Sequence, residues 1–163
     1  MTERRKCRGD FSTRDRIAAI PPRVWVLVGL PRSGKSTWAN ENALRLNATI
    51  LSADDIRRAL GIEWDRKFEP MVWRTFNLMA RVLIIRGQNV IADTTNLTRA
   101  RRKWWVEMAS DGLIRLEFVE FTDPGDEELR QRCEDSDYPW EVVQQLRRDY
   151  EPVAEDEGYV TEM

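Results

Sequence analysis

The sequence predicts an α/β fold in three layers, in which helices cover both faces of a parallel sheet. Short apolar runs rich in β-branched residues at 24–28, 48–52 and 89–93 are typical of buried strands, and they alternate with helical stretches. A glycine-rich segment, residues 29–37, joins the first strand to the first helix. A chain of 163 residues, 42% of them hydrophobic, is sufficient for one core of this kind.

The glycine-rich segment reads Gly-Leu-Pro-Arg-Ser-Gly-Lys-Ser-Thr and fits the phosphate-binding pattern G-x-x-x-x-G-K-[ST]. Its context fits as well, because the strand Val24–Val28 precedes it and a helix predicted over Ser36–Leu46 follows it. The glycines let successive backbone N–H groups point inward, and the positive end of the helix completes an anion site. We therefore predict binding of ATP or GTP and set aside a simple glycine turn. The predicted nucleotide-binding residues are Gly29, Arg32, Ser33, Gly34, Lys35, Ser36 and Thr37.

Three of these side chains have separate expected roles in binding a triphosphate. Lys35 reaches the β- and γ-phosphates, Ser36 offers its hydroxyl to Mg²⁺, and Thr37 adds a contact to the α-phosphate. A strand predicted over Asn89–Asp93 ends in the carboxylate of Asp93, which is expected to hold the same Mg²⁺ directly or through water. The two segments together predict a magnesium nucleotide site.

The composition narrows the class of partner. A formal net charge of −2 and a pI near 5.4 show that the chain is not cationic overall, so a nucleic-acid partner must be held locally. The chain has no histidine and only two distant cysteines, which argues against a zinc site. It lacks a signal-peptide core and any apolar run near the ~18 residues of a membrane span. We expect a soluble, cytoplasmic protein with no membrane contact and no obligate protein partner.

The two ends of the chain differ in charge. Residues 1–23 carry seven basic and three acidic residues, whereas residues 149–163 carry six acidic residues and no basic one. Both ends are interpreted first as solvated tails, and a basic arm that contacts phosphates is the alternative for the N-terminal one. The predicted division is a basic tail over 1–23, one domain over 24–152 and an acidic tail over 153–163.

The second predicted strand, Ala48–Ser52, leads into a short helix that Gly61 ends. Ser52 and Asp55 have the spacing of a capping box, so Asp55 is interpreted as part of the helix start. For Asp54 we favour a catalytic role over the same capping role. The reason is that open α/β sheets place their ligands at the carboxyl ends of parallel strands.

A mixed loop over 62–68 precedes a long predicted helix, Pro70–Arg86. Its apolar residues recur at helical spacing and predict a buried stripe. Trp73 and Met79 are interpreted as core residues, because that is the usual fate of large apolar side chains on such a stripe. The stripe itself consists of Val72, Phe76, Met79 or Ala80, Leu83 and Ile84.

The third strand is followed by a turn and a helix that begins near Thr98 and carries four cations. They form either a patch for the phosphate of an acceptor or one exposed helix face, and the sequence leaves both open. The four are Arg99, Arg101, Arg102 and Lys103. A last strand is predicted over Leu113–Phe121.

The C-terminal third predicts a helical lid. A helix starts near Thr122–Pro124, the polar segment Glu134–Pro139 interrupts it, and a second helix runs over Trp140–Tyr150. Two helices separated by a polar break are what a mobile cover over a nucleotide requires.

Four motifs taken together, 29–39, 52–57, 90–97 and 128–133, resemble the 5′-OH polynucleotide kinase branch of the small P-loop kinases. The resemblance covers about residues 24–152. It implies the P-loop NTPase fold with a parallel sheet in the order 2-3-1-4, and right-handed crossovers are expected. Related ATP-binding modules share much of the same set, so the resemblance does not by itself guarantee activity.

The resemblance implies roles for individual residues. Asp54 matches the general base on the 5′-hydroxyl, and Arg57 matches the residue that holds the neighbouring phosphate of the acceptor. Arg132 corresponds to a lid arginine on the nucleotide phosphates. Thr95 and Asn96 lie in the family's acid-threonine-asparagine turn, where they position the acceptor or the loop, and Asp93 matches the acid near the metal. The implied catalytic residues are thus Lys35, Asp54, Arg57 and Arg132.

Two positions depart from the family pattern. Arg32 stands where glycine is common, which stiffens the loop or presents an extra cation. A second lid arginine is replaced by the acidic run 134–137, so Arg130, Arg147 or Arg148 would have to substitute for it.

The implied function is transfer of the γ-phosphate of ATP, with Mg²⁺, to the 5′-hydroxyl of a DNA or RNA end. Two alternatives remain open. One is a P-loop kinase for a small-molecule hydroxyl, which the acidic pI favours slightly. The other is a module that binds ATP without transferring phosphate, which the altered lid favours.

Overall fold

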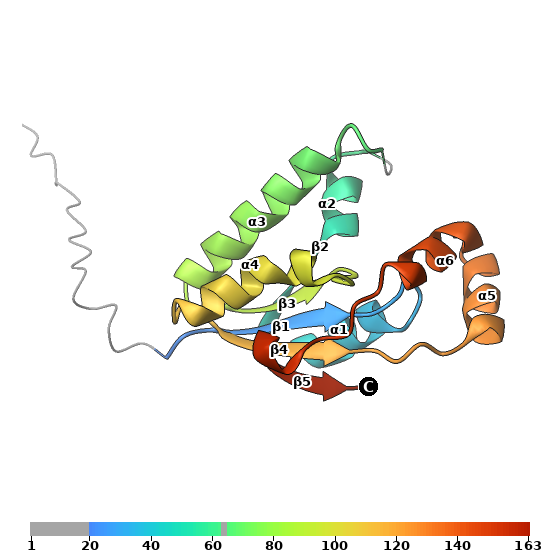
Figure 1. The fold of residues 1–163 in the computed structure, drawn as a ribbon. Coiled ribbons are helices and arrows are strands. Elements are labelled where there is room, and N and C mark those ends of the chain that lie inside the picture. Colours follow the sequence, from blue (N-terminus) through green and yellow to red (C-terminus); the bar gives the residue numbers. More distant parts are fainter. Residues whose placement is uncertain (1–19, 63–64) are drawn as a thin grey trace, which may run out of the picture.

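The computed structural model describes residues 20–62 and 65–163, whose centre is a five-stranded parallel sheet (Figure 1). The strand order is β2-β3-β1-β4-β5, and each neighbouring pair is parallel. The predicted order of the first four strands is confirmed, and a fifth strand extends the sheet beyond β4. The strands are β1 (Arg23–Val28), β2 (Ala48–Ser52), β3 (Asn89–Asp93), β4 (Arg115–Glu120) and β5 (Tyr159–Glu162).

Helices cover both faces of the sheet, so the predicted three layers are confirmed. β1 alternates between them: Val24 and Val26 pack under α3 and α4, whereas Trp25 and Leu27 pack against α1. Figure 1 shows α3 and α4 together over one face and the pair α5 and α6 beyond the carboxyl end of β4. The helices are α1 (Lys35–Ala43), α2 (Ala53–Ala59), α3 (Glu69–Ile85), α4 (Arg99–Ser110), α5 (Asp126–Glu134), α6 (Trp140–Arg148) and the 3₁₀ turn η2 (Glu155–Glu157).

Several predicted boundaries move by a few residues. α1 ends at Ala43 rather than Leu46, although Asn47 has the left-handed φ of 48° expected of a helix stop. β4 is shorter than predicted at both ends, and α5 begins after Gly125, whose N–H bonds to Asp123 at 2.9 Å. The lid keeps its predicted form of two helices around a polar break.

The interpretation of residues 149–163 as a solvated tail is wrong. Residues 159–162 form β5, which pairs in parallel with β4 from Glu117↔Tyr159 to Glu120↔Glu162. Glu157 is only 5% exposed, and its two carboxylate oxygens accept hydrogen bonds from Nε and Nη2 of Arg102 at 2.8 and 2.9 Å. A buried ion pair of this kind replaces the hydration that a carboxylate loses. The acidic C-terminal segment therefore adds the fifth strand to the sheet, although its composition is typical of a solvated tail.

The cations of α4 form neither a single acceptor patch nor a single exposed face. Arg102 is fully buried, while Arg99 pairs with Asp156 at 2.5 Å. Arg101 lies over the ring of Trp73 at 4.9 Å, and Lys103 pairs with Glu107 within the helix. Each cation thus has its own partner, because successive positions of a helix point in different directions.

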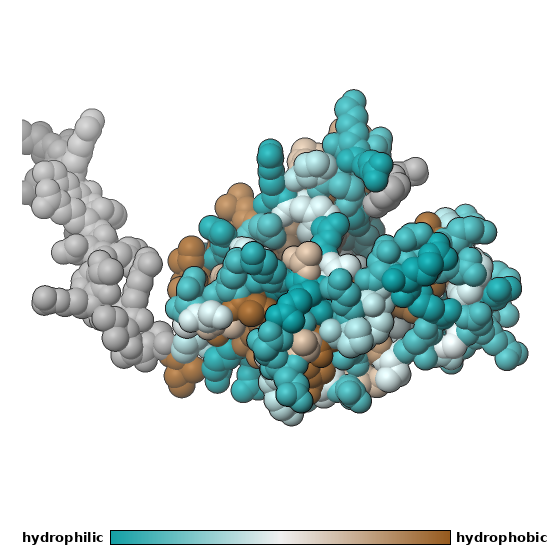
Figure 2. All heavy atoms as spheres, in the orientation of Figure 1, coloured by the Kyte–Doolittle hydropathy of each residue, from teal (hydrophilic) through white to brown (hydrophobic). Residues whose placement is uncertain are grey.

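The core prediction for Met79 is wrong: Ala80 occupies the buried position and Met79 is 43% exposed. The exposed face of α3 also carries Leu78, Val82 and Ile85 in the C-terminal half of the helix. In Figure 2 hydrophobic residues gather around the C-terminal end of α3. Trp73 is partly buried against the core, as predicted. In the described residues no helix is long and apolar enough to cross a bilayer. The predicted basic tail lies outside the described residues up to position 19.

Candidate active site

The carboxyl ends of three adjacent strands place the predicted residues at one edge of the sheet. Ser52 at the end of β2 is the register partner of Asp93 at the end of β3. The phosphate loop follows β1, which lies on the other side of β3, and Gly29 N–H bonds to the carbonyl of Thr95 at 3.1 Å. Loop, α2 and the β3 turn therefore meet where parallel sheets bind ligands.

Two glycines make the curl of the loop feasible. A Cβ on Gly29 would lie 3.0 Å from both the Cβ of Phe121 and the Oγ of Ser33, so that one of these neighbours would have to move. Gly34 has a φ of 101°, a conformation that L side chains rarely adopt, and it caps the N-terminus of α1. Ser36 and Thr37 then lie in the first turn of α1, where its N–H groups are free to bind an anion.

Lys35 is buried beneath this loop at 7% exposure. Its Nζ donates to the carbonyl of Leu30 at 2.5 Å and to Ser33 Oγ at 3.4 Å. Burial lowers the pKa of Lys35 to about 8, and the charges of Asp93 and Asp54 partly oppose that shift. The three predicted groups therefore act on one another electrostatically.

Oxygen groups suited to Mg²⁺ lie beside Lys35. Burial raises the pKa of Asp93, while a hydrogen bond from Ser36 and the charge of Lys35 lower it in part. The hydroxyl of Thr94 is buried and has no hydrogen-bond partner in the part of the chain that the structure describes. The Asp93 carboxylate and the Ser36 hydroxyl that bonds to it are a donor set that suits Mg²⁺, because this ion keeps most of its waters and binds few protein ligands.

On the other side of the site, Arg57 bridges two carboxylates. Its Nη1 donates to Asp54 at 2.5 Å, and its Nε and Nη2 donate to the two oxygens of Glu69 at 2.8 Å each. Trp73 Nε1 also donates to Glu69, at 3.1 Å. The Asp54 side chain is 83% exposed and so is accessible from solvent. Asp55 instead pairs with Arg58 at the surface, and its N–H is capped by Ser52 as predicted.

Glu69, which was not among the predicted site residues, fixes the direction of Arg57. Glu69 begins α3 and lies twelve positions from Arg57, beyond a loop that carries no regular pattern. A bidentate arginine and carboxylate pair is geometrically specific, and the hydrogen bond to Arg57 lowers the pKa of Glu69. Its only sequence signal was an acidic residue beside Pro70 at a helix start.

The turn after β3 holds the end of β1 and the start of the phosphate loop, because the Thr95 carbonyl accepts from the Gly29 N–H and the Asn96 side chain is buried. Asn96 is 6% exposed, has a φ of 45° and donates Nδ2 to the carbonyl of Leu27 at 2.8 Å. Arg102 donates Nη1 to the carbonyl of the same Asn96 at 3.1 Å. Of the two roles that were open for Asn96, these contacts favour positioning the loop.

The lid contacts the phosphate loop through polar and apolar side chains, and Leu30 of the loop packs with Leu129, Cys133 and Val143 of the lid. Arg132 Nη1 donates to the carbonyl of Arg32 at 2.8 Å, and Arg132 also pairs with Glu128 of its own helix. Arg32 has a φ of 64°, which costs about 1 kcal/mol or more for a residue with a Cβ. Its guanidinium lies 5.2 Å from the ring centre of Tyr138 in the lid break.

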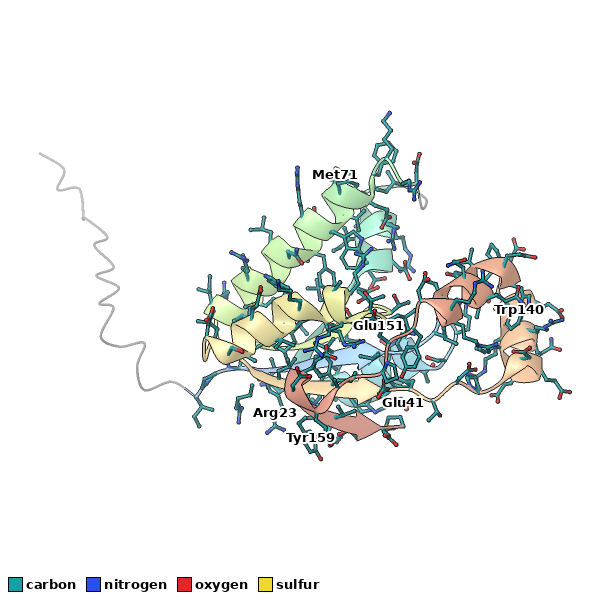
Figure 3. The ribbon with its side chains drawn as sticks, viewed as in Figure 1. Arg23, Glu41, Met71, Trp140, Glu151 and Tyr159 are labelled. Carbon is teal, nitrogen blue, oxygen red and sulfur yellow. The ribbon has the colours of Figure 1, made fainter. Side chains whose placement is uncertain are left out.

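The arginines considered as substitutes for a second lid arginine are engaged elsewhere. Arg130 and Arg147 both lie against the ring of Trp140, which Figure 3 places on the lid. Arg147 is also paired with Asp123 and Asp126, and Arg148 bonds to Gln145 at 2.6 Å.

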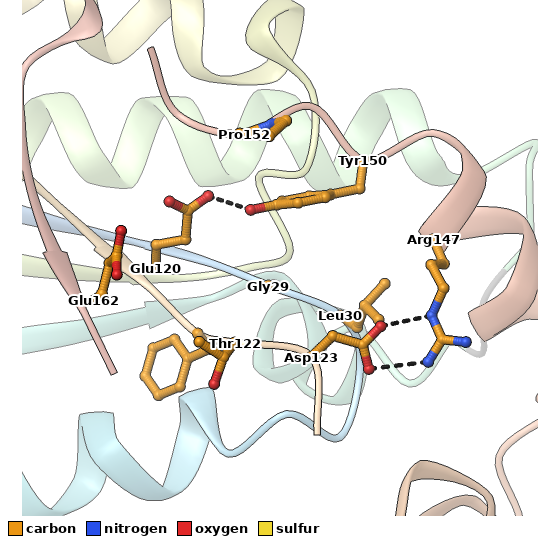
Figure 4. A pocket seen from close by; sticks show the side chains of 10 residues that line it. Gly29, Leu30, Glu120, Thr122, Asp123, Arg147, Tyr150, Pro152 and Glu162 are labelled. Atoms are coloured by element: carbon orange, nitrogen blue, oxygen red, sulfur yellow. Dashed lines mark hydrogen bonds and ion pairs between the residues drawn. The ribbon is translucent and has the colours of Figure 1, made fainter. Parts of the chain in front are cut away.

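A cavity of about 310 Å³ lies between the phosphate loop, the end of β4 and the C-terminal segment (Figure 4). Gly29 and Leu30 line one side of it. Across the cavity, the Tyr150 hydroxyl donates to Glu120, and burial together with that carboxylate raises the pKa of Tyr150. The rest of the lining is Phe121, Thr122, Asp123, Arg147, Pro152 and Glu162. The cavity therefore adjoins the phosphate loop, but none of the predicted catalytic residues lines it.

A family model described as an AAA domain matches residues 24–153, most of the chain. The chain belongs to the AAA domain family. No curated protein matches it at the sequence level.

Solved structures share the fold of this AAA domain. A chain of the Pnkp1/Rnl/Hen1 complex is 28% identical with a TM-score of 0.61; the match covers 69% of this chain but only 39% of that one. A gluconokinase from Sinorhizobium meliloti is 19% identical, with a TM-score of 0.57 and coverage of 88% and 83%. Kti12 from Chaetomium thermophilum, in complex with ADP-AlF3, is 16% identical, with a TM-score of 0.61 and coverage of 86% and 88%. The AAA domain therefore has the P-loop kinase fold.

Proposed function

We propose that this AAA domain is a kinase that transfers the γ-phosphate of ATP to a 5′-hydroxyl of a DNA or RNA end. The observation that carries the proposal is the accessible carboxylate of Asp54, just after the carboxyl end of β2, which accepts from Arg57, whose direction Glu69 fixes. The charge of Asp54 also acts on Lys35, where it partly opposes the lowering of the Lys35 pKa by burial. A nucleic-acid acceptor is supported further by the 28% identity to a chain of the Pnkp1/Rnl/Hen1 complex, which another solved structure describes as an RNA repair complex.

The residues divide the work of an in-line transfer. Asp54 orients the acceptor hydroxyl and takes its proton as the acceptor oxygen bonds to the γ-phosphorus. The bond between that phosphorus and the β,γ-bridging oxygen breaks, and ADP leaves with the bonding electrons. Lys35 and Arg132 hold the phosphate oxygens, and Arg57 binds the phosphate next to the hydroxyl with its remaining N–H groups.

Ser36 and Asp93 are the groups that would hold Mg²⁺. When bound, the ion neutralises charge on the β- and γ-phosphates. Asp93 lies on the β3 side of the loop and Asp54 beyond it on α2, so metal-binding and proton-accepting acids occupy different elements. Asp93 can therefore bind the metal while Asp54 accepts the proton.

End-labelling tests the proposal. The protein is incubated with Mg²⁺, γ-labelled ATP and single-stranded DNA or RNA oligonucleotides that carry a 5′-hydroxyl, with gluconate as a small acceptor in parallel. We expect label on an oligonucleotide 5′ end that a phosphatase removes, and no label when the 5′ end is already phosphorylated. Lys35→Met serves as the inactive control, because it removes the cation that binds the phosphates.

Two results would contradict the proposal. Label on the small acceptor alone would make the domain a kinase for small hydroxyl compounds. Tight ATP binding with neither transfer nor hydrolysis would make it a nucleotide-binding module.

Nucleotide binding is expected to take up a proton above pH 8. The pKa of Lys35 is about 8 in the free protein, and phosphate favours the charged form, so the pKa rises on binding. Between the two pKa values one proton is taken up. Affinity is therefore highest below pH 8 and falls as the pH rises, by up to about tenfold per pH unit. Titration calorimetry with ADP and EDTA, in buffers of different ionisation enthalpy, measures this uptake, and equal uptake on both sides of pH 8 would contradict it.

A further inference from the structure

Phosphoryl transfer spreads negative charge over three oxygens of the moving group, so cations at the loop mouth matter. Lys35 lies below the loop and Arg132 contacts it from the lid. The lid arginines other than Arg132 contact partners within the lid or next to it, rather than the phosphate loop. Arg147 is held by the two carboxylates of Asp123 and Asp126, and Arg130 lies on the ring of Trp140.

Arg32 has a different environment. It belongs to the phosphate loop itself, its side chain is exposed, and no carboxylate of the described residues forms an ion pair with it. Its guanidinium lies 5.2 Å from the ring centre of Tyr138. A cation–π contact of an exposed arginine is weaker than a charge-assisted bond to phosphate, so this guanidinium is available to a phosphate group.

Tyr138 joins Arg32 to the lid. It lies in the break between α5 and α6, and the Arg32 guanidinium lies over its ring. The charge of Arg32 also acts on Lys35, and the charges of Asp54 and Arg57 act on the Tyr138 hydroxyl, whose pKa burial raises. The carbonyl of Arg32 accepts from Arg132 at the same time, so this residue contacts the lid at two points.

We propose that Arg32 is a further catalytic residue of this domain, whose guanidinium moves from Tyr138 onto the γ-phosphoryl oxygens as transfer proceeds. There the guanidinium neutralises negative charge on the γ-phosphoryl group, while the bond to the acceptor oxygen forms and the bond to the bridging oxygen of ADP breaks. The strained backbone of Arg32 is consistent with this role, because strain at a single residue often persists where function needs it. The role rests on the proposed phosphotransfer.

Arg32→Gly tests this role without an obligatory loss of stability. Glycine adopts the φ of 64° freely, so the melting temperature is expected to stay within a few degrees of wild type. We expect kcat to fall by at least about 10²-fold with little change in the affinity for ADP. Affinity for ADP with Mg²⁺ and aluminium fluoride, which mimics the moving phosphoryl group, is expected to fall by a similar factor. Arg32→Lys should recover part of both losses.

Several outcomes would overturn the proposal. One is equal affinity of wild type and Arg32→Gly for ADP with aluminium fluoride. Another is a large loss in Arg147→Gln with none in Arg32→Gly, which would assign the cation to α6. Because the fluoride complex needs no acceptor, absence of end-labelling together with a selective loss in Arg32→Gly would reject the nucleic-acid acceptor and retain Arg32.

Discussion

Asp54→Asn is expected to lower kcat by about 10²–10⁴-fold while the affinity for ATP stays nearly unchanged. The amide has the size of the carboxylate and still accepts from Arg57, but it cannot take a proton from the acceptor. The side chain is 83% exposed, so the fold does not depend on its charge. Steady-state kinetics with a 5′-hydroxyl oligonucleotide and a separate measurement of ATP binding give the two quantities.

Asp55→Asn is the matched control for this substitution. Asp55 is the next residue on the same helix, but it pairs with Arg58 at the surface rather than with Arg57. Its variant is expected to retain wild-type kcat. Full turnover in Asp54→Asn would remove Asp54 from the mechanism, whereas equal losses in both variants would indicate a general effect on α2.

Arg102→Met is expected to lower the free energy of unfolding by about 3–5 kcal/mol, because it leaves the carboxylate of Glu157 buried without its partner. Both side chains of the pair are almost fully buried. Arg102 also donates to the carbonyls of Glu151 and Pro152, at 2.9 and 3.2 Å, so the loss extends to the segment that returns from α6 to the sheet. Figure 3 labels Glu151 on this segment. Urea denaturation measures the change.

Two further variants separate charge burial from other effects. Lys103→Met, at the neighbouring exposed position paired to Glu107 at 3.6 Å, is expected to change stability by no more than about 0.5 kcal/mol. The double variant Arg102→Met and Glu157→Leu should recover part of the loss, since no unpaired charge is then buried. A change below about 1 kcal/mol in Arg102→Met would show that β5 does not depend on this pair.

The pH dependence of the same pair has a definite sign. Burial alone would raise the pKa of Glu157, but the hydrogen bonds from Arg102 and from the Ala154 N–H outweigh it, and the net shift is downward. A carboxyl group whose pKa is lowered in the folded state stabilises the fold above its unfolded pKa of about 4.3. That stability is lost as the pH falls through the lower folded value.

The nearby elements of the site were predictable because their signals are local. The loop 29–37 carries its own pattern, and the strands on each side of it are apolar over consecutive residues. Asp54 and Asp93 were selected because each ends or follows a strand. Adjacent strand ends meet at one edge of a parallel sheet, so three separate stretches could be assigned to one site.

Partners that lie far apart in the sequence were not predictable. Glu69 and Tyr138 each reach the site from an element whose own pattern predicts only a helix start and a polar break. Met79 and Ala80 differ by one helical position, and the sequence could not decide which one faces the sheet. β5 was missed because acidic composition normally indicates solvation.

The phosphate loop, the layered fold and the candidate acids could be predicted from the residues alone, because each depends on residues within one turn or one strand. The folded chain was needed to reveal that Arg102 and Glu157 are a buried pair, that the C-terminal segment is a strand, and that Arg32 lies against the lid. The physical reason is that a charged side chain becomes a buried or functional group only when a distant partner replaces its water. No local pattern encodes the position of that partner.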